Sequence, residues 1–191
     1  MKIIRLREIS GMTEPAIDVI PESAIQKTGK PFFLPDFSES FRCRAAVGIR
    51  ICRLGKNIAA KFASRYYEEA GICLTIEASD LLEKLKAAHA PWALATAFDG
   101  AVIVGSFCKE NKDLLENELP VTFSTNGIKI EQVSSPKIPD FDTMIAYVSQ
   151  FFTLKMGDCL LIERGDFHKL SLDDHIAVKL GNYESLNIKI K

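Results

Sequence analysis

Alternation of hydrophobic and polar positions runs through the chain and predicts a series of short strands. The clearest case is the segment 121–133, in which two alternating stretches flank Asn126 and Gly127. An Asn-Gly pair supplies the two positive φ angles that a type I′ turn requires, so we predict a β-hairpin here. Other short apolar or alternating strands are predicted at 45–52, 71–76, 101–105, 159–162, 176–180 and 185–190.

Three segments have the spacing of amphipathic helices instead, with apolar residues three or four positions apart. The predicted helices are 58–69 with Asn57 as its N-cap, 81–88 with Asp80 and Glu83 as a capping box, and 143–152 capped by Asp142. Many short strands with three modest helices are typical of an α+β, mainly β domain and not of a regular βαβ arrangement. We therefore predict that residues 1–191 form a single domain.

The composition of the chain argues against some classes of partner but does not indicate a particular one. The chain has 191 residues, 47% of them hydrophobic, and 24 Lys and Arg residues balance 25 Asp and Glu residues. This balance gives no electrostatic reason to expect nucleic acid or an anionic membrane as a partner. The N-terminal residues are charged and no apolar segment approaches the roughly 18 residues of a membrane span, so we expect a cytoplasmic protein. The five cysteines include no C-x-x-C pair, which predicts reduced thiols.

A local charge imbalance is the main candidate for chemistry. Between residues 41 and 67 there are seven basic residues and no acidic one. On a strand, Arg42, Arg44 and Arg50 share one face with Ala46, while the opposite face is apolar. This charged face is interpreted either as an anion site or as a solvated face that discourages strand pairing.

Several segments carry a resemblance to a known family. They are 49–57, 90–100 and 145–158, together with the shorter segments 21–24 and 30–37. In this order they resemble the fumarylacetoacetate hydrolase family, and within it the short single-domain bacterial members related to acylpyruvate hydrolases. The resemblance extends over about residues 14–161.

The resemblance implies a mixed β-sheet roll or barrel, of the type of the family's C-terminal domain, that often forms a homodimer. It also implies a Mg²⁺ or Mn²⁺ ion held by three carboxylates. This ion would polarise a β-dicarbonyl substrate for carbon–carbon bond hydrolysis, decarboxylation or isomerisation. A hard cation with oxygen ligands suits this chemistry because it stabilises the developing enolate as a Lewis acid.

The residues at the family's functional positions differ from this pattern. The positions that the resemblance assigns to the three metal ligands hold Arg44, Ala46 and Thr75, and the position of the family's lysine holds Thr96. With Arg42, these residues would line a vestigial pocket. We therefore predict a degenerate family member that binds no cofactor and has no catalytic residues.

Such a protein would act as a binding or interaction module. Arg44, with Arg42, would bind a small carboxylate through charge-assisted hydrogen bonds. The alternative for Arg44 is a collapsed pocket whose guanidinium reaches solvent. As an interaction module, the chain would form a homodimer, or a heterodimer with an intact paralogue.

A second hypothesis keeps catalysis. In it, the chain is an active hydrolase, isomerase or decarboxylase of small keto acids, of the acylpyruvate or oxaloacetate type, with a relocated site. The titratable residues nearest the family's substrate loop, which falls on 162–165, would then carry the chemistry: Glu77, Glu163, Asp166 and His168.

Overall fold

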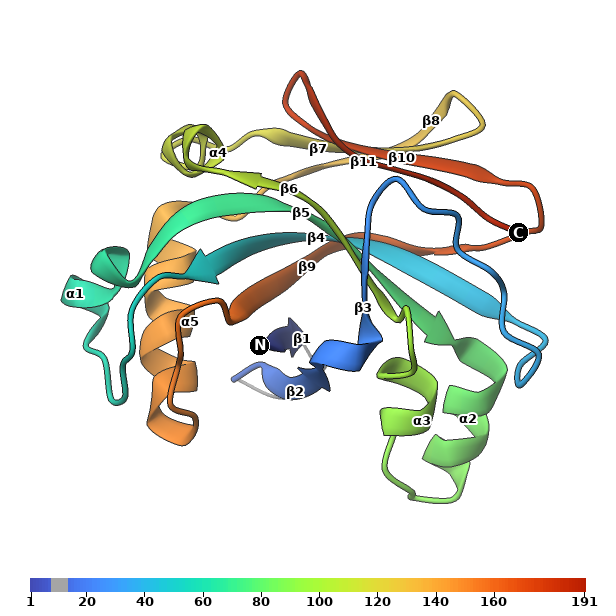
Figure 1. The fold of residues 1–191 in the computed structure, drawn as a ribbon, viewed down its shortest axis with the longest axis horizontal. Coiled ribbons are helices and arrows are strands. Elements are labelled where there is room, and N and C mark those ends of the chain that lie inside the picture. The colour runs from blue at the N-terminus through green and yellow to red at the C-terminus, as the bar shows by residue number, and fades with distance from the viewer. Residues whose placement is uncertain (8–13) are drawn as a thin grey trace.

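The computed structural model describes residues 1–7 and 14–191, which form two β-sheets and several short helices (Figure 1). The strands are β1 Lys2–Arg7, β2 Ala16–Pro21, β3 Ile25–Lys27, β4 Phe41–Ile51, β5 Tyr67–Ala78, β6 Val102–Cys108, β7 Pro120–Thr125, β8 Ile128–Ser134, β9 Cys159–Lys169, β10 His175–Leu180 and β11 Tyr183–Lys189. The helices are α1 Ala60–Ala63, α2 Ser79–Ala87, α3 Ala93–Thr96, α4 Lys109–Leu114 and α5 Ile138–Phe151, with the 3₁₀-helices η1 Glu22–Ala24 and η2 Ser64–Tyr66.

The larger sheet has seven strands in the order β2-β1-β9-β4-β5-β6-β3. Strand β1 is parallel to β9 and β3 is parallel to β6, while the other pairs are antiparallel. The long central strands β4, β5 and β9 curve strongly across the molecule (Figure 1). This mixed, curled sheet confirms the predicted mainly β class and roll.

The smaller sheet, β11-β10-β7-β8, lies over one face of the larger one (Figure 1). Its β7–β8 hairpin confirms the prediction at 121–133, because Asn126 and Gly127 both have positive φ angles of 53° and 79°. The main core includes alternate residues of β4, from Cys43 to Ile51, and Val178 of β10. On the other face of the larger sheet, Ala46 is also buried in a second apolar cluster, so this face of β4 is not simply a solvated one.

The helices differ from prediction where strand pairing competes with helical periodicity. The predicted helix 58–69 is wrong beyond its first turns, because Tyr67 pairs with Ile51 and begins strand β5. Phe62, in the middle of the predicted helix, is 43% exposed. A long antiparallel pairing overrides weak local propensity here.

The predicted caps were also misplaced. Helix α5 begins before Asp142, and Asp140 accepts a hydrogen bond from the backbone N–H of its N-cap, Lys137, at 2.7 Å. Asp142 instead accepts a hydrogen bond from the Tyr67 hydroxyl at 3.0 Å. Asp80 lies inside the first turn of α2 and accepts hydrogen bonds from the Ser38 hydroxyl and the Glu39 N–H.

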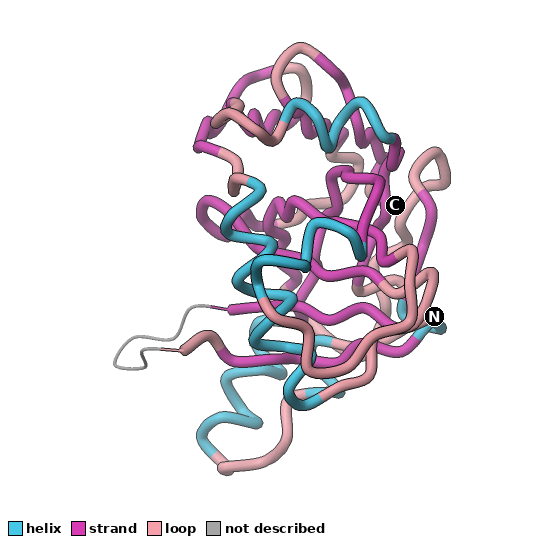
Figure 2. Tube along the Cα trace, turned by 90° about the vertical axis from the view of Figure 1, so that its left-hand side faces the viewer, coloured by secondary structure: helices cyan, strands magenta, loops and turns pink. Residues whose placement is uncertain are grey.

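The described part of the chain contains five α-helices, whereas three were predicted. The short helices α3 and α4 are the two that were not predicted. Figure 2 shows helices in front of the strands on the side of α1 and α5. None of the described helices is long and apolar enough to cross a membrane. All five cysteines are unpaired thiols.

Candidate functional site

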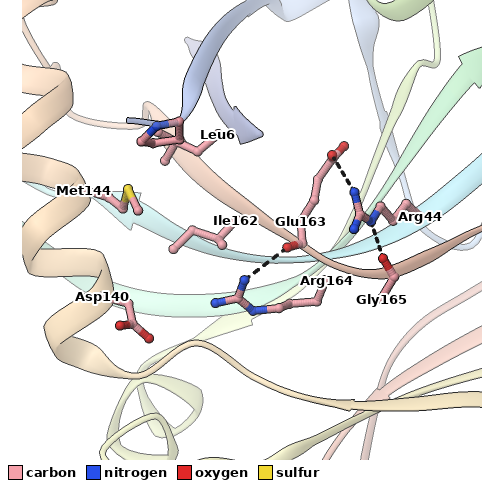
Figure 3. Close-up of a pocket in the computed structure, with 9 residues that line it drawn as sticks. Leu6, Arg44, Asp140, Met144, Ile162, Glu163, Arg164 and Gly165 are labelled. Atoms are coloured by element: carbon pink, nitrogen blue, oxygen red, sulfur yellow. Dashed lines mark hydrogen bonds and ion pairs between the residues drawn. The ribbon is translucent and has the colours of Figure 1, made fainter. Parts of the chain in front are cut away.

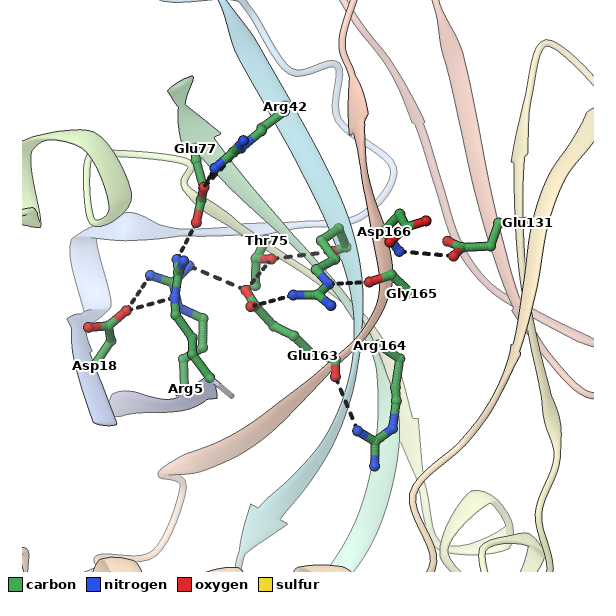
Figure 4. Close-up of polar contacts among 12 residues, drawn as sticks. Arg5, Asp18, Arg42, Thr75, Glu77, Glu131, Glu163, Arg164, Gly165 and Asp166 are labelled. Atoms are coloured by element: carbon green, nitrogen blue, oxygen red, sulfur yellow. Dashed lines mark hydrogen bonds and ion pairs between the residues drawn. The ribbon is translucent and has the colours of Figure 1, made fainter. Parts of the chain in front are cut away.

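Neighbouring strands of the larger sheet place charged side chains together near its middle (Figure 4). Strands β1, β2, β4, β5 and β9 each contribute at least one. We call this set the charged cluster, and its members are Arg5, Arg7, Asp18, Arg42, Arg44, Glu77 and Glu163.

Glu163 is the centre of the cluster. Its strand β9 runs antiparallel to β4, and the register places Glu163 opposite Ala46. The side chain is 3% exposed, and its Oε1 accepts a hydrogen bond from the Thr75 hydroxyl at 2.8 Å. Arg5 Nη1 lies 3.6 Å from Oε1, and Arg44 Nη1 lies 3.7 Å from Oε2. Within the described structure, Oε2 is buried and accepts no hydrogen bond, and it faces the Arg44 guanidinium.

The remaining carboxylates also face guanidinium groups. The fully buried Arg5 donates to Asp18 at 2.8 Å, and burial lowers the pKa of Arg5, an effect that nearby Arg7 reinforces and Glu163 and Asp18 oppose. Glu77 is fully buried and accepts hydrogen bonds from Arg42 at 3.0 and 3.1 Å, and Arg7 contacts its other oxygen. An arginine stays protonated even when buried, so these are charged pairs.

A cavity of about 320 Å³ opens beside Glu163 and Arg44 (Figure 3). Its lining is Leu6, Pro15, Arg44, Asp140, Met144, Ile162, Glu163, Arg164 and Gly165. A guanidinium and a carboxylate on the wall of one partly apolar cavity can bind a small anion and exchange a proton with it.

The structure brings together only part of the predicted vestigial pocket. Arg44 and Thr75 are register partners on β4 and β5, and Ala46 follows on the same face. Their shared space is taken up by the Glu163 carboxylate, and Arg42 pairs with Glu77. Thr96 does not belong to this group, since its hydroxyl donates to the Trp92 carbonyl and it lines a separate cavity of about 290 Å³.

The imbalance of charge between residues 41 and 67 is compensated from outside that segment. Arg44 faces Glu163, and Arg50 donates to Glu69 at 2.6 Å. These arginines are therefore not a fully solvated face, and the binding of an anion by Arg44 stays a prediction.

The alternative catalytic set is divided between two places. Glu77 and Glu163 belong to the charged cluster, whereas Asp166 lies in a bulge of β9 and His168 just beyond it, and both contact Glu131 of β8. The Asp166 N–H and His168 Nε2 each lie 2.9 Å from a Glu131 oxygen. These four residues therefore do not form one constellation.

Sequence reasoning missed several residues of the site. Arg5, Arg7 and Asp18 belong to strands that were not predicted, because charged residues interrupt their apolar pattern. The importance of Glu131 could have been predicted from the sequence. The predicted hairpin places Glu131 directly opposite Phe123, whose side chain is buried. A carboxylate that shares a strand face with a buried aromatic residue is expected to need a polar partner.

The residues around Arg44, Ala46 and Thr75, where the resemblance places the metal ligands, do not suit the binding of a divalent cation. Among the described residues, Glu163 is the carboxylate that contacts Arg44 and Thr75, and two guanidinium groups already face it. A hard dication requires several oxygen ligands and is repelled by nearby cations. In the described part of the chain, no three His, Cys, Asp or Glu side chains are placed to hold a metal ion.

Comparison with known proteins identifies the relatives. The model of the fumarylacetoacetate (FAA) hydrolase C-terminal family matches residues 6–162. The oxaloacetate tautomerase FAHD1 of Mus musculus is 26% identical over 183 residues, which are 94% of this chain and 82% of that protein. Oxaloacetate tautomerase YcgM of Escherichia coli is 25% identical over 85% of this chain and 79% of its own.

Solved structures show the same fold. A fumarylacetoacetate hydrolase family protein from Yersinia pestis is 24% identical with a TM-score of 0.88, covering 100% of this chain and 92% of its own. A fumarylpyruvate hydrolase from Pseudomonas aeruginosa, solved in complex with Mn²⁺ and pyruvate, is 14% identical with a TM-score of 0.88, covering 100% of this chain and 89% of its own. This Mn²⁺ complex corrects our expectation of no cofactor, because a protein of the same fold binds a metal. The match over most of the chain shows that it belongs to the fumarylacetoacetate hydrolase family.

Proposed function

We propose that the chain catalyses proton transfer at carbon in a small oxo acid of the oxaloacetate or acylpyruvate type. One observation carries the proposal: Glu163, with one oxygen that accepts no hydrogen bond, and Arg44 line the same cavity. The relatives named oxaloacetate tautomerase support this substrate class. Keto–enol tautomerisation needs only one proton to move between carbon and oxygen, which a single placed carboxylate can do.

Each residue of the cluster has a role in this proposal. Arg44 binds a carboxylate of the substrate by charge-assisted hydrogen bonds. The ionised Glu163 takes the proton from the carbon beside the ketone and returns it to the enolate oxygen, so the enzyme is unchanged after the cycle. Thr75 donates a hydrogen bond to the Glu163 carboxylate and Arg5 lies beside it, so both hold it in place.

The relatives support an active enzyme over our first prediction of a degenerate protein. Their names are those of enzymes, and the carboxylate that β4 lacks at Ala46 is supplied by the adjacent strand as Glu163. The loss of catalysis stays a prediction.

The substitution Glu163→Gln tests the proposal because it removes the basic oxygen and keeps the size of the side chain. We expect the keto–enol interconversion of oxaloacetate, followed by enol absorbance, to slow about 10²–10⁴-fold. Glu68→Gln is the control, because Glu68 is exposed and pairs with Lys109 outside this cavity. Wild-type protein that does not accelerate the reaction, or Glu163→Gln that retains the full rate, would rule the proposal out.

Anion binding without turnover is the second candidate. The observation that favours it is that the Arg42 and Arg44 guanidiniums lie over one ring, Phe167, at 4.3 and 5.1 Å from its centroid. Titration calorimetry that detects dicarboxylate binding to a protein without tautomerase activity would support this candidate. The homodimer and the heterodimer with a paralogue stay predictions, which sedimentation velocity tests.

A further inference from the structure

The bulge in β9 is the structural feature next to the candidate site that the proposed function does not use. In the register with β4, Cys43 faces His168 and Ala45 faces Arg164, so residues 165–167 lie opposite the single residue Arg44. Gly165 has a φ angle of +75°, which other residues rarely adopt. The bulge therefore places irregular backbone directly against Arg44.

This bulge supports the arginine in two ways. The Gly165 carbonyl accepts a hydrogen bond from Arg44 Nε (Figure 3). The Phe167 ring lies under the guanidinium of Arg44, at 5.1 Å from the centroid. Cation–π stacking and a hydrogen bond on one short segment fix both the position and the plane of the guanidinium. The orientation of Arg44 in the cavity thus depends on where the bulge lies.

Glu131, from the other sheet, holds the bulge. Its Oε1 accepts a hydrogen bond from the Asp166 N–H at 2.9 Å (Figure 4), and its Oε2 lies 2.9 Å from His168 Nε2. The His168 ring in turn stacks on Phe123 with centroids 4.2 Å apart. The Glu131 side chain is 19% exposed, so both contacts are partly shielded from water. One side chain of β8 therefore contacts the middle of the segment that supports Arg44, at Asp166, and the residue that follows the segment, His168.

We propose that Glu131 is a positioning residue, which fixes the β9 bulge and through it the Arg44 guanidinium at the cavity. This inference rests on the proposed function for its effect on the reaction. Loss of Glu131 weakens substrate binding, because Arg44 holds the substrate. The rate after binding changes less, because Thr75 and Arg5 still hold Glu163.

Kinetics of three variants at Glu131 test the inference. In Glu131→Ala we expect the KM for oxaloacetate to rise about tenfold, the effect of about one hydrogen bond, with kcat within about twofold. Glu131→Gln can still accept from Asp166 and donate to a neutral His168, so we expect it to retain the wild-type KM. Glu131→Asp is too short to contact both groups and should resemble Glu131→Ala. It replaces Glu131→Ala if that variant does not fold, and Glu68→Gln is again the control.

Proton exchange at Arg44 Nε–H, measured by NMR, gives a test that needs no substrate. We expect this proton and the Asp166 amide to exchange at least about tenfold faster in Glu131→Ala and Glu131→Asp, and at the wild-type rate in Glu131→Gln. If Arg44 Nε–H keeps its wild-type protection without Glu131, the inference is wrong. If protection falls but the wild-type protein has no activity, the proposed function fails and the positioning role of Glu131 stands.

Discussion

Arg5 and Asp18 are direct register partners on the antiparallel strands β1 and β2, and their side chains are joined by a 2.8 Å hydrogen bond. Arg5 is fully buried and also lies 3.6 Å from Glu163, so it links the edge of the larger sheet to the candidate site. A buried charge is tolerated only when it is paired, so the folded state depends on these partners.

Replacing Arg5 by methionine should therefore destabilise the protein strongly. The substitution removes the fully buried cation that pairs with both Asp18 and Glu163, and leaves Arg7 beside Asp18 and Arg44 beside Glu163. Breaking a buried pair of this kind costs about 3–5 kcal/mol. Urea unfolding followed by circular dichroism measures the change. The control is Lys189→Met, which removes an exposed pair with Asp173 and should cost less than about 1 kcal/mol. Equal losses in the two variants would show that the burial of Arg5 is of no consequence.

The contacts of Asp158 predict how the free energy of unfolding depends on pH. Burial would raise the pKa of Asp158, but hydrogen bonds from the Lys2 ammonium, the Lys155 N–H and the Lys2 N–H outweigh it and lower the pKa below its ordinary value. A lowered pKa in the folded state means that the stabilisation is complete above the unfolded value near 3.9 and is lost as the pH falls through the folded value.

We therefore expect Asp158→Asn to lower the free energy of unfolding by about 2 kcal/mol at pH 7. The difference between the variant and the wild type should shrink as the pH falls below about 4, because the wild-type carboxyl group then becomes protonated. Urea titrations at a series of pH values test this. A difference that stays constant down to pH 2 would contradict the assignment of the stabilisation to the ionised carboxylate.

Local signals in the sequence were sufficient for some elements. The hairpin 121–133 was predicted correctly because Asn126 and Gly127 specify their turn without help from the rest of the chain. The apolar face of β4 was also predicted correctly, because the strict alternation of apolar and polar residues determines which side chains face the core. Strand β1 was missed, because its buried Arg5 becomes tolerable only through Asp18 and Glu163, which come from distant segments.

The candidate site was predictable in part. The resemblance located its strands, and Glu163 was among the alternative catalytic residues. Its position opposite Ala46, and its separation from Asp166 and His168, depend on the bulge at 165–167, which shifts the register between β4 and β9. No local pattern fixes a register shift between strands more than a hundred residues apart, so the division of this set could not be foreseen.

Removing Arg44 should weaken the binding of dicarboxylates. We expect Arg44→Met to lower the affinity for oxaloacetate and malonate about tenfold or more, since a charge-assisted contact is lost. Titration calorimetry with malonate and the KM for oxaloacetate measure the effect. Arg50→Met is the matched control, because Arg50 lies on the same strand and pairs with Glu69 but lines a different cavity. Unchanged affinity for every dicarboxylate in Arg44→Met would rule out Arg44 as the anion-binding residue.

Two glycines with similar backbone angles offer a matched test of the bulge. Gly127 and Gly165 have φ angles of +79° and +75°, but an added methyl group meets nothing within 4 Å at Gly127 and collides with the Glu131 carboxylate at Gly165. Gly127→Ala should therefore cost only the backbone term of about 1 kcal/mol. Gly165→Ala should cost about 2–3 kcal/mol, because Glu131 must also move away from Asp166 and His168. Urea unfolding compares the two, and equal costs would show that Glu131 is not held tightly against the bulge.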